Sequence, residues 1–130
     1  MKMKPGDVVT NEQIVEQFKC SPQGGMRRSH RTNTLVLVTK HTEDNIYADR
    51  WHDGILDYVG MGQSGNQSFN FMQNWTLYNS RSNGVELHLF EVFESGFYTY
   101  VGRVVLDGEP RMEQHGDRSV CVFPLRVIEG

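Results

Sequence analysis

One carboxylate stands between two phenol rings, close to a pair of glycines, near the middle of this chain. Tyr47 precedes Asp49 by two residues, Tyr58 follows Asp49 by nine, and Gly60 and Gly62 come directly after it. Aromatic faces stack on planar rings, and a carboxylate accepts hydrogen bonds from an amine such as that of cytosine. A nucleobase taken out of a duplex needs both kinds of contact. We therefore predict a base-binding pocket here, where the bare glycine backbone lets a base edge approach closely.

Simpler structural explanations exist for the same residues. Asp49 could cap a loop or pair with Arg50, and Tyr58 could belong to the core of a strand. Trp51, two residues beyond Asp49, competes with Tyr47 for the place of the first aromatic wall. Both positions stay open as candidates.

A glycine-rich segment nearer the N-terminus carries the residues that we expect to contact DNA. Arginine binds phosphate through two parallel hydrogen bonds, and an apolar side chain can wedge between base pairs. The candidates for phosphate contacts or insertion are Met26, Arg27, Arg28, His30 and Arg31. The alternatives are a solvated charge cluster and a packed methionine.

The charge of the chain is unevenly distributed. The net charge is -3, but residues 1–32 carry six basic and three acidic side chains (+3), whereas residues 33–130 carry seven basic and thirteen acidic ones (-6). This excludes a strongly basic domain and allows a local positive patch. If DNA is the partner, affinity must depend on few phosphate contacts and on a pocket, with a shallow salt dependence.

Metal, cofactor and catalytic signatures do not stand out in the sequence. Cys20 and Cys121 are too far apart for a zinc knuckle or a redox pair, so we expect two reduced core thiols. The five histidines include no pair spaced by four residues. We expect no metal, no cofactor and no catalytic residue.

The pattern of apolar residues predicts the elements that position the pocket. A capping box at Thr10 to Gln13 starts a helix over residues 11–18. Strands are predicted over 34–39, 55–59, 85–93, 97–106 and 119–127, with a hairpin turn at 94–96. Apolar residues spaced by three and four predict an amphipathic helix between 67 and 80, where Gln67 and Asn74 are expected to support the pocket loops.

This order of elements predicts an α+β fold: one domain over residues 1–130, built as a small, mixed, strongly curved β-barrel with two helices packed outside. No apolar run is long enough to cross a bilayer, and the N-terminus lacks the apolar core of a secretion signal, so we expect a cytoplasmic protein.

At this point the sequence resembles the SET-and-RING-associated (SRA) domains, readers of modified cytosine related to the pseudouridine-synthase-associated (PUA) fold. The resemblance covers most of the chain. It rests on the segments Lys4-Pro-Gly-Asp-Val, Tyr47-Ala-Asp49, Tyr58-Val-Gly-Met-Gly62 and Gly65-Asn-Gln67. It implies that Asp49 accepts a hydrogen bond from a flipped 5-methylcytosine or 5-hydroxymethylcytosine in duplex DNA, between two aromatic side chains.

The chain departs from the family pattern in two ways. Tyr47 stands two residues before Asp49, where the family has a tyrosine three before, and the loop after the glycine turn is shorter. An element that fills the hole left by an extruded base is therefore expected from elsewhere in the chain. Residues 23–29 and 84–92 resemble the bacterial branch, often fused to an HNH nuclease, which implies a modification-dependent restriction system; this chain carries no nuclease motif.

Two other functions remain as alternatives to a DNA-binding module. The first is an RNA- or nucleotide-binding barrel of the same fold without methyl specificity, which would use the pocket on an unpaired base. The second is an enzyme on a small base-like molecule, with Asp49 as general base and a nearby histidine as acid. The sequence contains no recognisable combination of a nucleophilic side chain with a general base, so it does not favour the enzyme.

Overall fold

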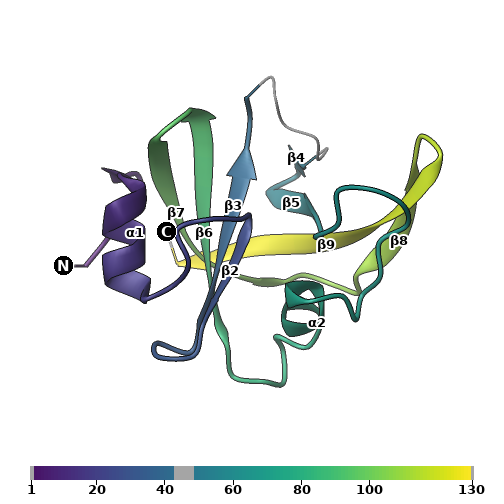
Figure 1. Cartoon of the computed structure of the whole chain (residues 1–130), viewed down its shortest axis with the longest axis horizontal. Helices are drawn as coiled ribbons and strands as arrows, with labels where there is room; N and C mark the ends of the chain where they lie inside the picture. The colour runs from purple at the N-terminus through teal and green to yellow at the C-terminus, as the bar shows by residue number, and fades with distance from the viewer. Residues whose placement is uncertain (1, 43–48, 130) are drawn as a thin grey trace.

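The computed structural model describes residues 2–42 and 49–129, which form a mixed sheet with two short helices (Figure 1). The elements in chain order are β1 (Val8–Val9), α1 (Asn11–Phe18), β2 (Met26–Ser29), β3 (Thr34–Lys40), β4 (Arg50–His52), β5 (Ile55–Val59), α2 (Gln73–Tyr78), β6 (Glu86–Glu94), β7 (Phe97–Leu106), β8 (Arg111–His115) and β9 (Arg118–Glu129).

The nine strands form one sheet whose main path runs β2-β3-β6-β7-β9-β5-β4, with β1 paired to β7 and β8 paired to β9. The pairing of β3 with β6 is parallel, and the other pairings are antiparallel. Among the described residues the path of paired strands has β2 and β4 at its ends, so the structure shows a nine-stranded mixed sheet, and closure of this sheet into the strongly curved barrel stays a prediction.

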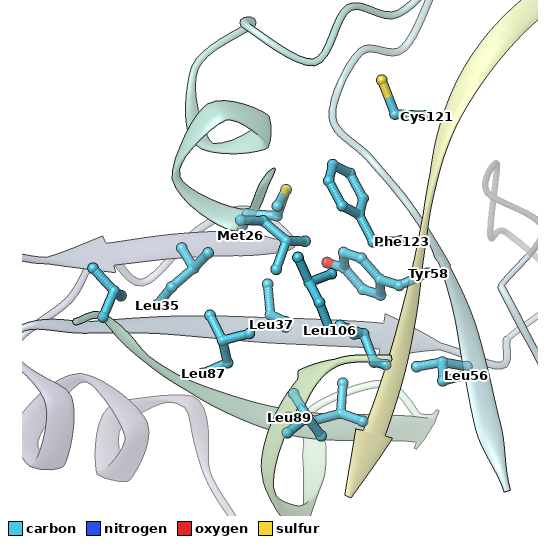
Figure 2. Close-up of a cluster of buried hydrophobic side chains, with 14 residues drawn as sticks. Met26, Leu35, Leu37, Leu56, Tyr58, Leu87, Leu89, Leu106, Cys121 and Phe123 are labelled. Atoms are coloured by element: carbon cyan, nitrogen blue, oxygen red, sulfur yellow. The ribbon is translucent and has the colours of Figure 1, made fainter. Parts of the chain in front are cut away.

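The position of β3 between two core clusters explains the unbroken apolar run in its sequence. Leu35 and Leu37 face the main core cluster, whereas Val36 and Val38 face a second cluster under α1. A strand buried on both faces needs apolar residues at every position. The main cluster also contains Tyr58 of β5 (Figure 2).

Helix α1 begins as the sequence predicts. The Thr10 hydroxyl accepts a hydrogen bond from the Gln13 backbone N–H, and the Gln13 side chain accepts one from the Thr10 backbone N–H. Ile14 and Phe18 are buried against the sheet. Among the described residues, no helix is long and apolar enough to cross a membrane.

The second helix is shorter than predicted. It covers only Gln73–Tyr78, because Met72 has a φ of 46° and a ψ of -125°, a backbone conformation that interrupts a helix. The apolar spacing that suggested a buried face is also misleading in part: Leu77 is buried, but Phe71, Met72 and Trp75 are exposed.

The strands over 55–59 and 97–106 are confirmed, and those over 34–39, 85–93 and 119–127 agree within two residues at each end. The glycine-rich segment that we expected as a loop is in part a strand, β2, which pairs with β3. Strands β1, β4 and β8 were not predicted, since two to five residues carry too little periodic signal.

Candidate nucleic-acid interface

Asp49 lies at the gap between β3 and β5, just before β4 begins. Its Oδ2 accepts a hydrogen bond of 2.8 Å from the Thr39 hydroxyl, and its Oδ1 accepts one of 2.7 Å from the Val59 backbone N–H. A carboxylate has about four lone-pair positions. Among the described residues only these two donors reach it, so the group keeps acceptor capacity for a ligand.

The electrostatic environment of Asp49 disfavours its charge. Burial raises the pKa of its carboxyl from 3.8 to about 6, although the hydrogen bonds from Val59 and Thr39 and the charge of His41 act in the opposite direction. Removal from water is therefore the dominant influence. An amine or a protonated ring nitrogen brought to this carboxylate would donate a further hydrogen bond to it and so stabilise its charged form.

Tyr58 crosses the gap from the other side. Its hydroxyl donates to the Gly25 carbonyl oxygen at 2.7 Å and lies 3.2 Å from the Val38 carbonyl oxygen. The side chain thus connects β5 to β3 and to the residue before β2. With only 3% of its surface exposed, Tyr58 is in the first place a core residue that fixes the separation of these strands.

Gln67 and Asn74 hold the glycine turn that follows Tyr58. The Gln67 amide donates to the carbonyl oxygens of Gly60 at 2.7 Å and Gly62 at 3.1 Å. Its oxygen accepts from the Cys121 backbone N–H at 2.8 Å. The Asn74 side chain pairs with both backbone groups of Met61, at 2.6 and 3.1 Å.

Glycine is needed at both ends of this turn. A Cβ at position 60 would lie 2.6 Å from Asn74 Oδ1, closer than real contacts allow. Gly62 has a φ of 125°, and a Cβ there would lie 3.1 Å from Cγ of Gln67. Hydrogen bonds from the two amide side chains therefore hold this turn, and their close approach leaves no room for a Cβ atom at position 60 or 62.

These elements enclose a pocket of about 790 Å³. Its volume is within the range of about 300–1,000 Å³ typical of small-ligand sites. The residues that line it are Pro22, Gln23, Gly24, Gly25, Met26, Arg27, Val38, Lys40, Asp49, Tyr58, Val59, Gly60, Met61, Gly62, Gln63, Phe71, Met72 and Tyr98. The pocket combines one half-buried acid with two aromatic rings besides Tyr58, namely Phe71 and Tyr98, and with two basic residues.

A second hollow, of about 610 Å³, lies over α1 and is lined by Gln13, Glu16, Gln17 and Lys19. In the part of the chain that the structure describes, no aromatic side chain lines this hollow, so these residues offer no ring on which a base could stack.

Of the two candidates for the first aromatic wall, Tyr47 and Trp51, the structure describes only Trp51. Tyr47 lies outside the described residues. Trp51 does not line the pocket, and its indole N–H donates to Glu91 at 2.9 Å. The structure thus gives Trp51 a partner elsewhere on the sheet, and the aromatic residues that it brings to the pocket are Tyr58, Phe71 and Tyr98.

The predicted phosphate-binding arginines are divided by burial. Arg27 is 4% exposed, with hydrogen bonds to Asn11 at 2.6 Å and to the Gly24 carbonyl oxygen at 2.8 Å. Arg28 binds the carbonyl oxygens of Ser29 and Thr34. Both guanidinium groups are thus engaged within the protein, whereas His30 and Arg31 are exposed in the turn that follows β2.

Met26 is buried in the main core cluster and also lines the pocket. Its side chain is therefore packed, which was the alternative to the wedge role, and insertion of Met26 into a duplex stays untested. Residues of the site that the sequence did not single out include Met61, Phe71, Met72 and Tyr98, which line the pocket, and Thr39, which donates a hydrogen bond to Asp49. Phe71 and Met72 could have been noticed as two adjacent large apolar residues between polar ones.

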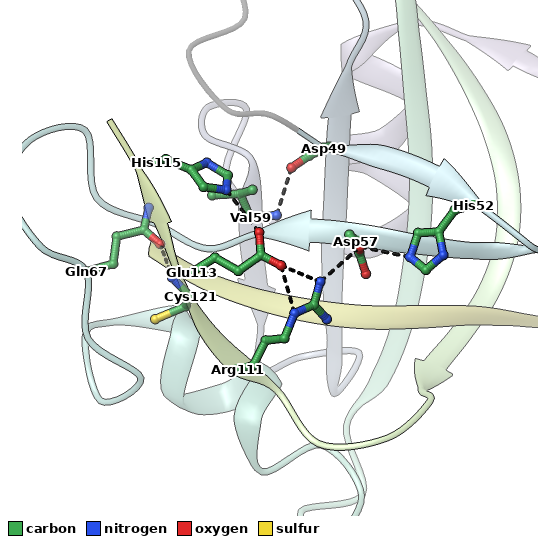
Figure 3. A network of polar contacts seen from close by, with 9 residues as sticks. All are labelled: Asp49, His52, Asp57, Val59, Gln67, Arg111, Glu113, His115 and Cys121. Carbon is green, nitrogen blue, oxygen red and sulfur yellow. Dashed lines mark hydrogen bonds and ion pairs between the residues drawn. The ribbon is translucent and has the colours of Figure 1, made fainter. Parts of the chain in front are cut away.

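A separate polar network covers the part of the sheet formed by β4, β5, β8 and β9 (Figure 3). Asp57 accepts from Arg111 at 3.0 Å and contacts His52 at 2.8 Å, and Glu113 joins Arg111 to His115. Glu113 has a lowered pKa, chiefly through the hydrogen bond with His115. Among the described residues, no group of three or more His, Cys, Asp or Glu side chains could hold a metal ion.

Comparison with solved structures defines the fold class. An SRA domain of SUVH5 bound to hemi-methylated CG DNA aligns with a TM-score of 0.78 at 20% identity over 100% of this chain and 91% of that one. KRYPTONITE in complex with mCHG DNA aligns with a TM-score of 0.75 at 14% identity over 98% of this chain. The fold is therefore that of an SRA domain.

The sequence defines the family more narrowly. The model of the ScoMcrA-like SRA domain matches residues 5–130, and the chain belongs to this family. The solved sulfur-binding and SRA domains of ScoMcrA, complexed with phosphorothioated DNA, align with a TM-score of 0.72 at 18% identity over 100% of this chain. A search of curated proteins gave no match.

The chain spans 41% of the length of that ScoMcrA structure and 32% of the KRYPTONITE chain. A further structure, of ScoMcrA as a phosphorothioation-dependent restriction endonuclease, is covered to 25%. This chain therefore spans less than half the length of each of those structures.

Proposed function

We propose that this domain binds duplex DNA carrying a modified cytosine, 5-methylcytosine or 5-hydroxymethylcytosine, by extruding the base into the pocket beside Asp49. The observation that carries the proposal is the position of Asp49, whose carboxylate accepts from two donors among the described residues and lies in the wall of a 790 Å³ pocket. Its remaining acceptor positions suit the exocyclic amine of cytosine.

Energies of ordinary size suffice for this mode of binding. Extruding a paired base costs a few kcal/mol. Stacking on an aromatic side chain returns about 1–3 kcal/mol, and a hydrogen bond to a charged group about 1.5–3 kcal/mol. Tyr58 lines the pocket but exposes only 3% of its surface, so its stacking role, like that of Tyr47, remains a prediction. The glycine turn would present its backbone to the base edge.

Selectivity for the modified base needs more than a methyl contact. Burying one methyl group is worth about 0.8 kcal/mol, which gives roughly a fourfold preference. A stronger preference requires an apolar niche for the substituent, and Val38, Val59 and Met61 are among the aliphatic residues of the pocket wall that could form one.

We further propose that the domain is the specificity module of a modification-dependent restriction system, with cleavage supplied by a nuclease domain or partner. Support comes from the family, whose solved member ScoMcrA is described as a type IV restriction endonuclease. On this account the domain itself binds and does not catalyse.

Titration of four matched duplexes, with cytosine, 5-methylcytosine, 5-hydroxymethylcytosine or glucosylated hydroxymethylcytosine at one site, tests the proposal. We expect tighter binding to at least one modified duplex than to the plain one. Equal affinity for all four would contradict it. Tighter binding to single-stranded RNA than to any of these duplexes would favour a general base-binding function instead.

A further inference from the structure

Two large apolar side chains stand exposed at the mouth of the pocket. Phe71 is 45% and Met72 61% exposed, and both line the pocket. Trp75, on the same short helix, is 51% exposed but does not line it. Adjacent exposed apolar residues next to a polar pocket commonly mark a surface that contacts a partner.

The backbone holds Met72 in an uncommon conformation. Its φ of 46° is positive, and residues other than glycine rarely adopt a positive φ except at functional or tightly held positions. The Asn74 backbone N–H donates to the Phe71 carbonyl oxygen at 3.0 Å, and that of Trp75 to the Met72 carbonyl oxygen at 3.2 Å. Hydrogen bonds thus hold the backbone while the Met72 side chain projects outward.

The surrounding sequence is free of charge. Residues 58–80 contain no Asp, Glu, Lys or Arg, in a chain that carries 16 acidic residues. Arg118, which is distant in sequence, donates hydrogen bonds to the carbonyl oxygens of Gly62 and Gly65 within this stretch. This segment therefore contributes no carboxylate that would repel a polyanion, and the basic residues Lys40 and Arg27 line the same pocket.

We propose that Met72 enters the duplex beside the pocket and fills the space that the extruded base leaves, with Phe71 packing next to it at the rim. This inference rests on the proposed function. Apolar side chains wedge between base steps in many DNA-bending proteins, and the unbranched methionine side chain adapts to irregular gaps. The buried Met26 cannot take this role without leaving the core.

The test compares wild type with Met72→Gly on a modified duplex and on the single strand of the same sequence. Glycine adopts the positive φ without strain, so the melting temperature should stay equal or rise. We expect Met72→Gly to bind the modified duplex roughly tenfold more weakly, the loss of about one stacking contact. Binding to the modified single strand, which has no stack to repair, should weaken much less, because only the contact of Met72 with the pocket is lost there.

Two further variants sharpen the comparison. Met72→Leu should bind the modified duplex within roughly threefold of wild type, because it keeps a wedge of similar size. Trp75→Ala should leave the affinity unchanged, because Trp75 does not line the pocket.

Each possible result has one meaning. If wild type prefers the modified duplex and Met72→Gly binds it equally well, insertion of Met72 is excluded and the proposed function stands. Equal losses on duplex and single strand would make Met72 a pocket wall and also exclude insertion. If wild type shows no preference for a modified duplex, the proposed function itself fails.

Discussion

Asp49 and Val59 are joined by a hydrogen bond of 2.7 Å, from the Val59 backbone N–H to Oδ1 of the carboxylate. The other oxygen of the same carboxylate binds Thr39 of β3, so one side chain connects β3 to β5 across the gap where the pocket lies. The residue that we assign to the ligand therefore also shapes the site, and its substitution affects both functions.

Asp49→Asn separates these two functions. The Asn oxygen can still accept from the Val59 N–H, and burial already disfavours the charge, so we expect the free energy of unfolding to change by less than about 1.5 kcal/mol. Preference for a modified duplex over a plain one should disappear. Asp53→Asn, an equal charge change at an exposed turn residue, should retain it. Retained preference in Asp49→Asn would contradict the assignment.

The raised pKa of Asp49 predicts a pH dependence of stability. With a folded pKa of about 6 and an ordinary value of 3.8, the native state holds a proton that the unfolded state loses between these values. The contribution of this group to stability is therefore complete below about pH 3.8 and is lost as the pH rises to about 6. Chemical denaturation across this range should show that the stability of Asp49→Asn relative to wild type increases with pH.

Binding should have the opposite pH dependence. The carboxylate is the stronger acceptor for an amine, so the ratio of affinities for modified and plain duplex should fall as the pH is lowered through about 6. The ratio removes effects that protonated histidines have on both duplexes alike. A ratio that stays constant from pH 7.5 to 5 would count against Asp49 as the acceptor.

Gly60→Ala tests the fit of the glycine turn against α2. The new Cβ would lie 2.6 Å from Asn74 Oδ1 and 3.1 Å from a ring carbon of Phe123, so the turn or the helix must shift. We expect a loss of about 1–3 kcal/mol in the free energy of unfolding. Gly25→Ala is the control, because its Cβ would meet Tyr58 at an ordinary 3.4 Å. Similar losses in both variants would argue against the specific clash.

Gln67→Leu tests the support of the turn by side-chain hydrogen bonds. The substitution keeps most of the volume but removes the partners of three backbone groups, on Gly60, Gly62 and Cys121. Leaving a buried backbone group unpaired costs about 1–3 kcal/mol, so a marked fall in melting temperature is expected. A melting temperature within a degree or two of wild type would mean that water replaces the amide.

The arginines of the N-terminal segment should separate into two groups. Arg31→Gln, at an exposed position, should weaken binding to all duplexes alike and reduce the slope of log K against log salt by about one. Arg27→Gln should instead lower the melting temperature, because its guanidinium group is buried against Asn11 and Gly24. The reverse result would show that Arg27 leaves its buried position to bind phosphate.

The sequence predicted well where a local pattern decides the structure. The capping box of α1 and the doubly buried run of β3 are examples, because hydrogen bonding at a helix start and alternation on a sheet depend on a few neighbouring residues. The spacing of Asp49 and Tyr58 likewise led to a pocket that contains both.

Other features depend on contacts between distant segments and could not be read locally. Arg27 resembles a solvated cation in sequence, but Asn11, 16 residues away, binds it in the fold. Trp51 stands close to Asp49 in the chain, yet its indole binds Glu91 on β6. Met72 lies in a helical apolar pattern, but its positive φ interrupts the helix, next to Asn74, which binds Met61 of the glycine turn.

The central claim, that a modified cytosine leaves the duplex and enters the pocket beside Asp49, is tested most directly by fluorescence of 2-aminopurine placed next to that cytosine. Loss of the neighbouring stack should raise the fluorescence when wild type saturates the modified duplex. Asp49→Asn at the same occupancy should give no comparable rise. Saturated wild-type complexes without a rise would show that the base stays stacked, which would contradict the account.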